Sequence, residues 1–90
     1  MVRVLMYSTA SCPFCRAAER LLERKGVRDI ERVRVDLEPE RRAEMVRRSG
    51  RRSVPQLWIG ERHVGGFDDL QALDETGELD RCLAADAAVS

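Results

Sequence analysis

Residues 2–15 read VRVLMYSTASCPFC, and this stretch decides the fold. Residues 2–8 are almost entirely apolar and rich in β-forming types, which predicts a buried strand. Ser11 and Cys12 follow, and Pro13 suits the first position of a helix because its missing N–H would have no partner there anyway. The stretch therefore predicts a strand that leads directly into a helix N-terminus, with a cysteine at the junction.

The segment after Pro13 has the pattern of an amphipathic helix. Apolar residues recur at helical spacing between residues 17 and 22, and the charged residues around them face water. Gly26 suits the position just after a helix end. Residues 30–36 then predict a second strand. A strand, a helix and a strand in this order predict a right-handed parallel crossover.

The rest of the chain supplies two more helices, a hairpin and a tail. The predicted elements are a helix from Pro39 to about Ser49, a strand over Pro55–Ile59, a strand over Arg62–Val64, a helix capped by Asp68 or Asp69 and ending near Thr76, and a helical segment over Glu78–Ala87. Gly60-Glu61 fits a two-residue hairpin turn. The order βαβαββα predicts an α/β domain with a four-stranded mixed sheet and helices on both faces. We expect one domain over residues 1–90, with a frayed tail over 85–90.

Composition excludes several classes of function. Sixteen basic residues balance sixteen acidic ones, which argues against a nucleic-acid-binding protein. No stretch approaches the roughly 20 apolar residues that span a membrane, so we expect no membrane partner. Residues 41–52 carry six arginines and one glutamate, which indicates either a solvated helix face or a patch that recognises a small anion.

The three cysteines point to redox chemistry in the cytoplasm. Two of them, Cys12 and Cys15, form a CxxC pair, whereas a secreted disulfide scaffold has more cysteines spread along the chain. In a reducing compartment a CxxC pair is catalytic or metal-binding rather than structural. We therefore predict a cytoplasmic location and a chemical role for the pair.

The position of Cys12 favours a thiolate. Ligands of open α/β sheets bind where strands end and helices begin. The first turn of the helix offers unpaired N–H groups, here those of Phe14 and Cys15, and the positive end of the helix dipole. Cys15 lies nearly one turn further on, close enough to form a disulfide and less exposed. The roles predicted from this placement are attack by Cys12 and resolution by Cys15.

Magnitudes show what a lowered pKa contributes. A free thiol has a pKa of about 8.5, and lowering it by about three units raises the thiolate fraction roughly thirtyfold. The same change costs roughly fifteen- to thirtyfold in intrinsic nucleophilicity. The two effects nearly cancel, so the advantage lies in Cys12 as a leaving group. A helix dipole supplies only about 0.3–2 kcal/mol of the roughly 4 kcal/mol required, and direct hydrogen bonds must supply the rest.

Outside this motif, the further residues of chemical interest are Trp58, His63 and Cys82. Cys12, Cys15, His63 and Cys82 form a formal zinc set, but the second half lacks the close spacing of zinc motifs and Pro13 favours a helix start. We predict that Cys82 is a small buried apolar residue, with a regulatory thiol as the alternative. His63 is predicted to lie at the surface, and Trp58 to pack against a helix in the core.

Three separated motifs together identify a family. They are Cys12-Pro13-Phe14-Cys15, Ser53-Val54-Pro55 and Gly65-Gly66-Phe67-Asp68-Asp69-Leu70. In this order the chain resembles the dithiol glutaredoxins of the short bacterial type over nearly its whole length. The resemblance implies a thioredoxin-like fold and a glutathione-dependent thiol–disulfide oxidoreductase with no permanently bound cofactor. It implies glutathione as cosubstrate, glutathionylated or disulfide-containing proteins as partners, and a monomer.

The resemblance also implies a binding groove for glutathione. Pro55 is then a cis proline, although only about 5–6% of X–Pro bonds in folded proteins are cis. The N–H and C=O of Val54 would pair with the cysteinyl part of glutathione as an added strand. Gly65 and Gly66 would permit close approach of the ligand.

The same resemblance assigns the start of the following helix to the other end of glutathione. The N–H groups around Phe67 and Asp68 suit its γ-glutamyl carboxylate, and the Asp68 carboxylate suits its ammonium group. Asp69 is then the helix cap.

Some positions depart from the family pattern. Phe14 stands where tyrosine is common but keeps the aromatic wall, and Ser53 replaces threonine. Thr9 stands where many relatives have a lysine that supports the thiolate and the glycyl carboxylate of glutathione. Possible substitutes are Arg16, Arg42 and Arg52, and we favour Arg42.

Two alternative functions stay open at this point. One is an electron donor reduced by thioredoxin reductase. The other is a module that binds or delivers an iron–sulfur cluster, since some relatives bridge a cluster through this cysteine and glutathione. Those relatives tend to have glycine or serine after the first cysteine, and Pro13 argues against this alternative.

Overall fold

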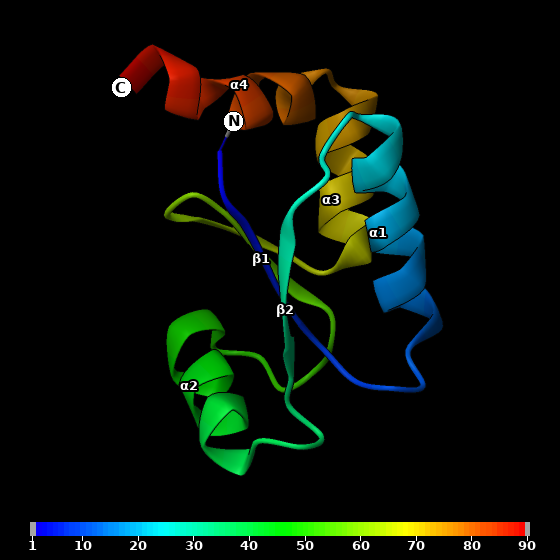
Figure 1. Cartoon of the computed structure of the whole chain (residues 1–90), viewed down its shortest axis with the longest axis vertical. Helices are drawn as coiled ribbons and strands as arrows, with labels where there is room; N and C mark the ends of the chain where they lie inside the picture. The colour runs from blue at the N-terminus through cyan, green and yellow to red at the C-terminus, as the bar shows by residue number, and fades with distance from the viewer. Residues whose placement is uncertain (1, 90) are drawn as a thin grey trace.

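The computed structural model describes the backbone of residues 2–89 and the side chains of residues 2–84. Its elements follow the chain in the order β1 (Val4–Ser8), α1 (Pro13–Arg24), β2 (Ile30–Arg34), α2 (Pro39–Ser49), β3 (Gln56–Ile59), β4 (Arg62–Gly65), α3 (Phe67–Glu75) and α4 (Glu78–Val89) (Figure 1). The predicted order of strands and helices is confirmed.

The four strands form one mixed sheet in the order β2-β1-β3-β4. β1 pairs with β2 in parallel and with β3 in antiparallel register, and β3 pairs with β4 as an antiparallel hairpin. In the second pairing Tyr7 lies opposite Gln56. Gly60 has a φ of 61°, as the predicted hairpin turn requires. The prediction of a four-stranded mixed sheet is confirmed.

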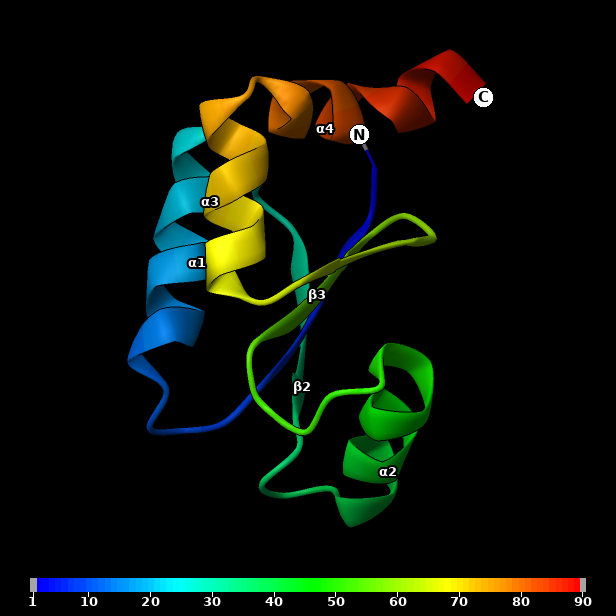
Figure 2. The same cartoon turned by 180° about the vertical axis from the view of Figure 1, so that it is seen from behind.

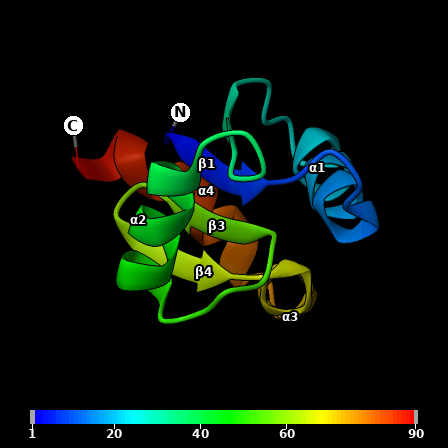
Figure 3. The same ribbon diagram turned by 90° about the horizontal axis from the view of Figure 1, so that it is seen from below.

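Helices cover both faces of the sheet, as predicted. α1 and α3 lie side by side on one face, and α2 lies on the other (Figures 1 and 2). Figure 3 shows β1, β3 and β4 between these two layers. Successive strand residues point to opposite faces, so Val4 and Met6 join the core under α1 and α3, while Tyr7 joins the core under α2.

The core under α2 has a polar margin. Its buried members are Tyr7, Val33, Val35, Met45 and Trp58. Tyr7 and Trp58 pack edge to face with ring centroids 5.4 Å apart. The Tyr7 hydroxyl donates to Glu44 and accepts a hydrogen bond of 2.9 Å from the Arg48 guanidinium, which also lies 4.3 Å from the Trp58 ring centre. The prediction that Trp58 packs against a helix in the core is confirmed.

Local signals fixed the helix ends well. Pro13 and Pro39 occupy the first turns of α1 and α2, and Gly26 and Gly50 follow their ends with φ of 88° and 74°. The N-cap residue of α3 is Gly66, not Asp68 or Asp69 as predicted. The Asp69 side chain still caps the helix from its first turn, because it accepts a hydrogen bond from the Gly66 N–H.

Other boundaries shift by a few residues. β2 ends at Arg34 because the chain turns there, with the Leu37 N–H donating to the Arg34 carbonyl at 3.1 Å. β3 begins at Gln56 rather than Pro55. α4 extends to Val89, two residues beyond the predicted end, and lies across the end of the molecule opposite the β1–α1 loop (Figure 1). The prediction of a frayed tail over residues 85–90 falls on side chains outside the described range, and residue 90 lies outside the described backbone as well. None of the described helices is long and apolar enough to cross a membrane.

The Tyr7 hydroxyl joins β1 to α2, and its removal should weaken the fold. We expect Tyr7→Phe to lower the free energy of unfolding by about 1–2 kcal/mol, because two hydrogen bonds to charged partners are lost. A lower urea midpoint at unchanged m-value measures this loss. Glu44→Gln, which keeps an acceptor for the hydroxyl, should cost less. A Tyr7→Phe midpoint equal to that of the unmodified chain would contradict the assigned role.

Candidate active site

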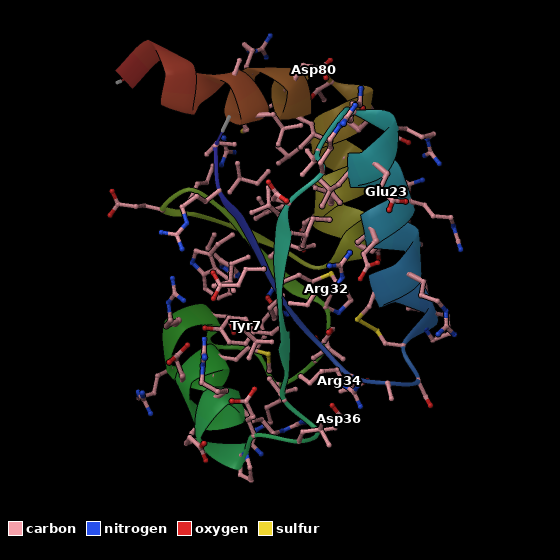
Figure 4. All side chains as sticks on the ribbon, in the orientation of Figure 1. Tyr7, Glu23, Arg32, Arg34, Asp36 and Asp80 are labelled. Carbon is pink, nitrogen blue, oxygen red and sulfur yellow. A yellow bond between two sulfur atoms is a disulfide. The ribbon has the colours of Figure 1, made fainter. Side chains whose placement is uncertain are left out.

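Cys12 and Cys15 meet where β1 leads into α1, as predicted. They form a disulfide with 5.2 Å between their Cα atoms, drawn as a yellow bond at one end of α1 in Figure 4. Cys12 is the N-cap of α1, and its sulfur accepts a hydrogen bond of 3.1 Å from the Cys15 N–H. Of the two predicted amide donors, Phe14 and Cys15, the second is the one that reaches the sulfur in this oxidised state.

Both sulfurs are protected from solvent in the disulfide form. Cys12 is 6% exposed and Cys15 is 3% exposed. The lower exposure of Cys15 agrees with its predicted role as the resolving cysteine, but the difference in exposure between the two residues is small. Access to Cys12 is therefore set by its neighbours, the exposed Pro13 and Phe14 on α1 and the two other motifs.

The second motif places a free segment of backbone before β3. The Val54–Pro55 peptide bond is cis, which confirms the expectation drawn from the resemblance. Pro55 is buried, Ser53 is exposed, and Val54 is half-buried against both apolar cores. Within residues 2–89, the N–H and C=O of Val54 make no hydrogen bond. These two groups are available to a ligand.

The third motif lies against the second. A Cβ atom at Gly66 would be 3.5 Å from the Pro55 carbonyl oxygen, and one at Gly65 would overlap the Asp69 carboxylate. Gly65 also has a φ of 112°, which other residues rarely adopt. Gly65 is thus required by its backbone conformation and by the approach of Asp69, a reason that the sequence did not indicate. A Cβ at Gly66 would make only an ordinary van der Waals contact.

The start of α3 offers amide donors. The Gly66 N–H is used by Asp69, at 2.9 Å, so it is not free for a ligand. The N–H groups of Phe67 and Asp68 have no partner in the described part of the chain, and the Asp68 side chain is exposed and also without a partner there. The capping role predicted for Asp69 is thus confirmed, whereas the ligand role of Asp68 stays a prediction.

An aromatic pair joins the first and third motifs. The rings of Phe14 and Phe67 stack with centroids 6.2 Å apart and planes 27° from parallel. Phe14 is 60% exposed, whereas Phe67 packs partly against the core under α1 and α3. The sequence identified both residues but not their contact, since helix packing brings them together.

A salt bridge that the sequence did not reveal ties the second motif to the third. The Arg51 guanidinium lies 2.9 Å from the Asp69 carboxylate, which also accepts from the Gly66 N–H. The Arg51 hydrogen bond, followed by that of Gly66, holds the pKa of Asp69 below its usual range. Arg51 carried no sequence signal beyond its membership of the arginine-rich segment.

The loop before Cys12 is anchored to the end of β2. The Ala10 N–H donates to the Asp36 carboxylate at 3.3 Å, and Arg34 binds the same carboxylate at 2.6 and 2.8 Å (Figure 4). The hydrogen bond from Arg34 holds the pKa of Asp36 at about 2. Thr9 lies half-buried in this loop.

Arg42, the favoured substitute for the family's lysine, lies beside the second motif. Its guanidinium donates to the Arg52 carbonyl at 3.3 Å, one residue before Ser53. Arg42 is exposed. Its binding role, like those of the other predicted ligand residues, stays a prediction.

The formal zinc set is not assembled. No group of three or more His, Cys, Asp or Glu residues in the described range is placed to hold a metal ion. Cys82 is 8% exposed and accepts a hydrogen bond of 3.1 Å from Arg62, so its predicted burial is confirmed. His63 lies on the edge strand β4 as predicted but is half-buried rather than a plain surface residue. Its ring packs 4.5 Å from that of Trp58, and its Nε2 lies 2.9 Å from the Gln56 side chain.

Comparisons with known proteins agree with this geometry. The family model described as Glutaredoxin matches residues 4–64. A glutaredoxin from Pseudomonas aeruginosa is 53% identical over 85 residues, covering 94% of this chain and all of that protein. Glutaredoxin 3 from Escherichia coli K12 is 45% identical over 83 residues, covering 92% and 99% of the two chains. The crystal structure of a buckwheat glutaredoxin–glutathione complex superimposes with a TM-score of 0.85 at 25% identity, covering 93% and 78%.

The Asp69 carboxylate should contribute stability that acid removes. Because its pKa is lowered on folding, the contribution is complete above the unfolded pKa of about 3.9 and is lost as the pH falls through the folded value. We expect Asp69→Ala to lower the free energy of unfolding at neutral pH by about 0.5–1.5 kcal/mol and to make stability less dependent on pH in the acid range.

Urea unfolding between neutral and acid pH measures this effect. Asp68→Ala is the matched control, because this neighbour is exposed and has no partner among the described side chains. Equal losses in the two variants at every pH would rule out a special role for Asp69.

Proposed function

The chain belongs to the glutaredoxin family of thiol–disulfide oxidoreductases, and we propose that it reduces glutathione mixed disulfides and protein disulfides with Cys12 as the nucleophile. The observation that carries this assignment of roles is the placement of Cys12 at the N-cap of α1, bonded to Cys15 and accepting its N–H. Cys15 is the resolving cysteine in this proposal.

The surroundings of Cys12 suit a thiolate leaving group. When the disulfide is reduced, the Cys15 N–H and the positive end of α1 act on a sulfur that carries negative charge. The first turn of α1 contains no acidic residue that would oppose this charge. A stabilised Cys12 thiolate is readily displaced from a mixed disulfide, and this speeds the second half of the reaction.

The proposed reaction with a glutathionylated protein has two steps. The Cys12 thiolate attacks the glutathione sulfur, forms a Cys12–glutathione disulfide and releases the protein thiolate, which takes a proton from water. A second glutathione thiolate then attacks the sulfur of the bound glutathione, which releases glutathione disulfide and restores the Cys12 thiolate. Cys15 takes no part in this route.

A protein disulfide follows a different second step. After Cys12 attacks one of its sulfurs, the Cys15 thiolate attacks Cys12, releasing the reduced protein and leaving the Cys12–Cys15 bond. Two glutathione molecules then reduce this bond and form one glutathione disulfide. The 5.2 Å separation of the two Cα atoms is within the ordinary range for a disulfide.

The proposed glutathione groove uses the groups that the fold leaves free. The unbonded N–H and C=O of Val54 suit the cysteinyl part of the ligand, and the free N–H groups of Phe67 and Asp68 suit its γ-glutamyl carboxylate. Phe14 forms the apolar wall, and Arg42 suits the glycyl carboxylate. The similarity to the buckwheat protein, solved with glutathione, supports this ligand. A cytoplasmic location and a monomeric state also stay part of the proposal.

Replacement of each cysteine separates the two routes. Cys12→Ser should abolish both activities, because it removes the proposed nucleophile. Of the thiols that remain, Cys15 is the less exposed member of the pair and Cys82 is buried. Cys15→Ser should keep most of the reduction of a glutathionylated peptide and lose the reduction of a protein disulfide. Assays coupled to glutathione reductase, one with the glutathionylated peptide and one with the protein disulfide, measure the two activities. Full activity of Cys12→Ser, or equal losses for the two substrates in Cys15→Ser, would refute the assigned roles.

A cation at position 9 should strengthen the site. In Thr9→Lys an ammonium group in the loop before Cys12 should lower the pKa of the Cys12 thiol, because an opposite charge favours the thiolate. It should also lower KM for a glutathionylated peptide about two- to fivefold, the range of an exposed ion pair. Thiolate absorbance as a function of pH measures the pKa of Cys12, and steady-state kinetics measure KM. Thr9→Gln, long but neutral, is the control and should leave both values near those of the unmodified chain; matching effects in the two variants would exclude charge as the cause.

A further inference from the structure

A buried amide lies next to the proposed glutathione strand. Ser8 and Gln56 are the buried polar residues among those described, and Gln56 is 0% exposed. The Gln56 Nε2 lies 3.1 Å from the Ser53 carbonyl oxygen and 3.4 Å from the Ser53 hydroxyl, and its Oε1 lies 2.9 Å from Nε2 of His63. The side chain therefore connects the edge strand β4 to the segment that contains Val54.

The partners assign a direction to these hydrogen bonds. A carbonyl oxygen only accepts, so the amide nitrogen of Gln56 faces Ser53 and its oxygen faces His63. The Nε2 of His63 must then carry a hydrogen. Donation runs from His63 to Gln56 and from Gln56 to Ser53, and we call these three residues the relay.

The His63 end of the relay is held by the core. Its ring packs 4.5 Å from the ring of Trp58, which is 4% exposed and packs in turn on Tyr7. Burial, followed by the positive charge of Arg51, lowers the pKa of His63, so the ring is neutral near neutral pH. In the neutral ring the hydrogen on Nε2 supplies the donation to Gln56, and Nδ1 is then an acceptor.

The Ser53 end is the part that needs support. Ser53 and Val54 belong to no helix or strand, and Ser53 is exposed. The hydrogen bonds made to Ser53 in the described chain both come from Gln56. A segment held in its binding conformation costs less entropy when a ligand adds to it. The relay therefore reduces the cost of placing the Val54 backbone for an incoming strand.

We propose that His63 and Gln56 are positioning residues for glutathione, which act by holding the Ser53–Val54 backbone through the relay. The inference rests on the proposed function, in which Val54 binds the cysteinyl part of the ligand. No hydrogen bond joins the relay to Cys12 in the described structure, so the relay should affect binding of the glutathione moiety and not the intrinsic reactivity of the sulfur.

Four variants test this proposal. Gln56→Met keeps the approximate side-chain volume and removes both the amide donor that faces Ser53 and the amide acceptor that faces His63. His63→Phe keeps a ring on Trp58 and removes the donor, whereas His63→Gln keeps a donor. The fourth variant combines Gln56→Met with His63→Phe. The readouts are KM and kcat for a glutathionylated peptide, the rate at which iodoacetamide alkylates reduced Cys12, and the urea midpoint.

The relay predicts a specific pattern. Gln56→Met should raise KM about three- to tenfold, as expected for lost hydrogen bonds, with little change in kcat or in the alkylation rate. His63→Phe should raise KM by a smaller factor, and His63→Gln should restore it to near the original value. The double variant should have the KM of Gln56→Met, because groups in one chain of hydrogen bonds are not additive.

Other patterns would overturn the relay. Unchanged KM in Gln56→Met, or equal KM in His63→Phe and His63→Gln with parallel losses of stability, would show that these residues only stabilise the fold. KM effects that multiply in the double variant would show that they act independently. If Gln56→Met does not fold, the two His63 variants still decide the question. Failure of the unmodified chain to reduce the glutathionylated peptide is a separate result, and it would refute the proposed function itself.

Discussion

The antiparallel register of β1 and β3 is the constraint on which the site depends. Because Tyr7 lies opposite Gln56, the end of β1 that leads to Cys12 lies beside the start of β3 that follows Pro55. The hairpin register then pairs Leu57 with Gly65 and brings the third motif to the same edge. Motifs separated by about forty and ten residues along the chain thus meet through two strand pairings. A slip of one residue would also exchange the two faces of β3.

Each side of the proposed groove is held by polar contacts as well as by packing. On one side Arg51 and the Gly66 N–H share the Asp69 carboxylate, which joins the segment before β3 to the start of α3. On the other side Gln56 bonds to Ser53. Backbone groups that bind an added strand must stay unpaired in the free protein, so side chains have to hold that backbone in place. This accounts for the concentration of side-chain hydrogen bonds around Val54, whose own N–H and C=O make none in the described chain.

Sequence reasoning succeeded where the deciding signal was local. Pro13 and Gly26 bound α1, and the strand–helix junction located Cys12, because proline and glycine act through the backbone of their own residue. It failed where the partner is distant. The burial of His63 depends on Trp58 across a hairpin, and the role of Arg51 depends on a helix eighteen positions later. The cis bond before Pro55 came only from the family resemblance, since the general frequency of X–Pro bonds favours trans.

The absence of a lysine at Thr9 changes how charge can act at the site. The sulfur of Cys12 has the Cys15 N–H and the end of α1 as its nearby positive groups, and the arginine favoured as a substitute lies beside Ser53 instead. In the proposed groove we therefore assign Arg42 to the carboxylate of the ligand rather than to the thiolate. In relatives with the lysine one cation serves both purposes, as the resemblance implies. In the site proposed here the two tasks fall to different groups, so the proposal predicts that substitution can change thiolate stability and ligand affinity independently.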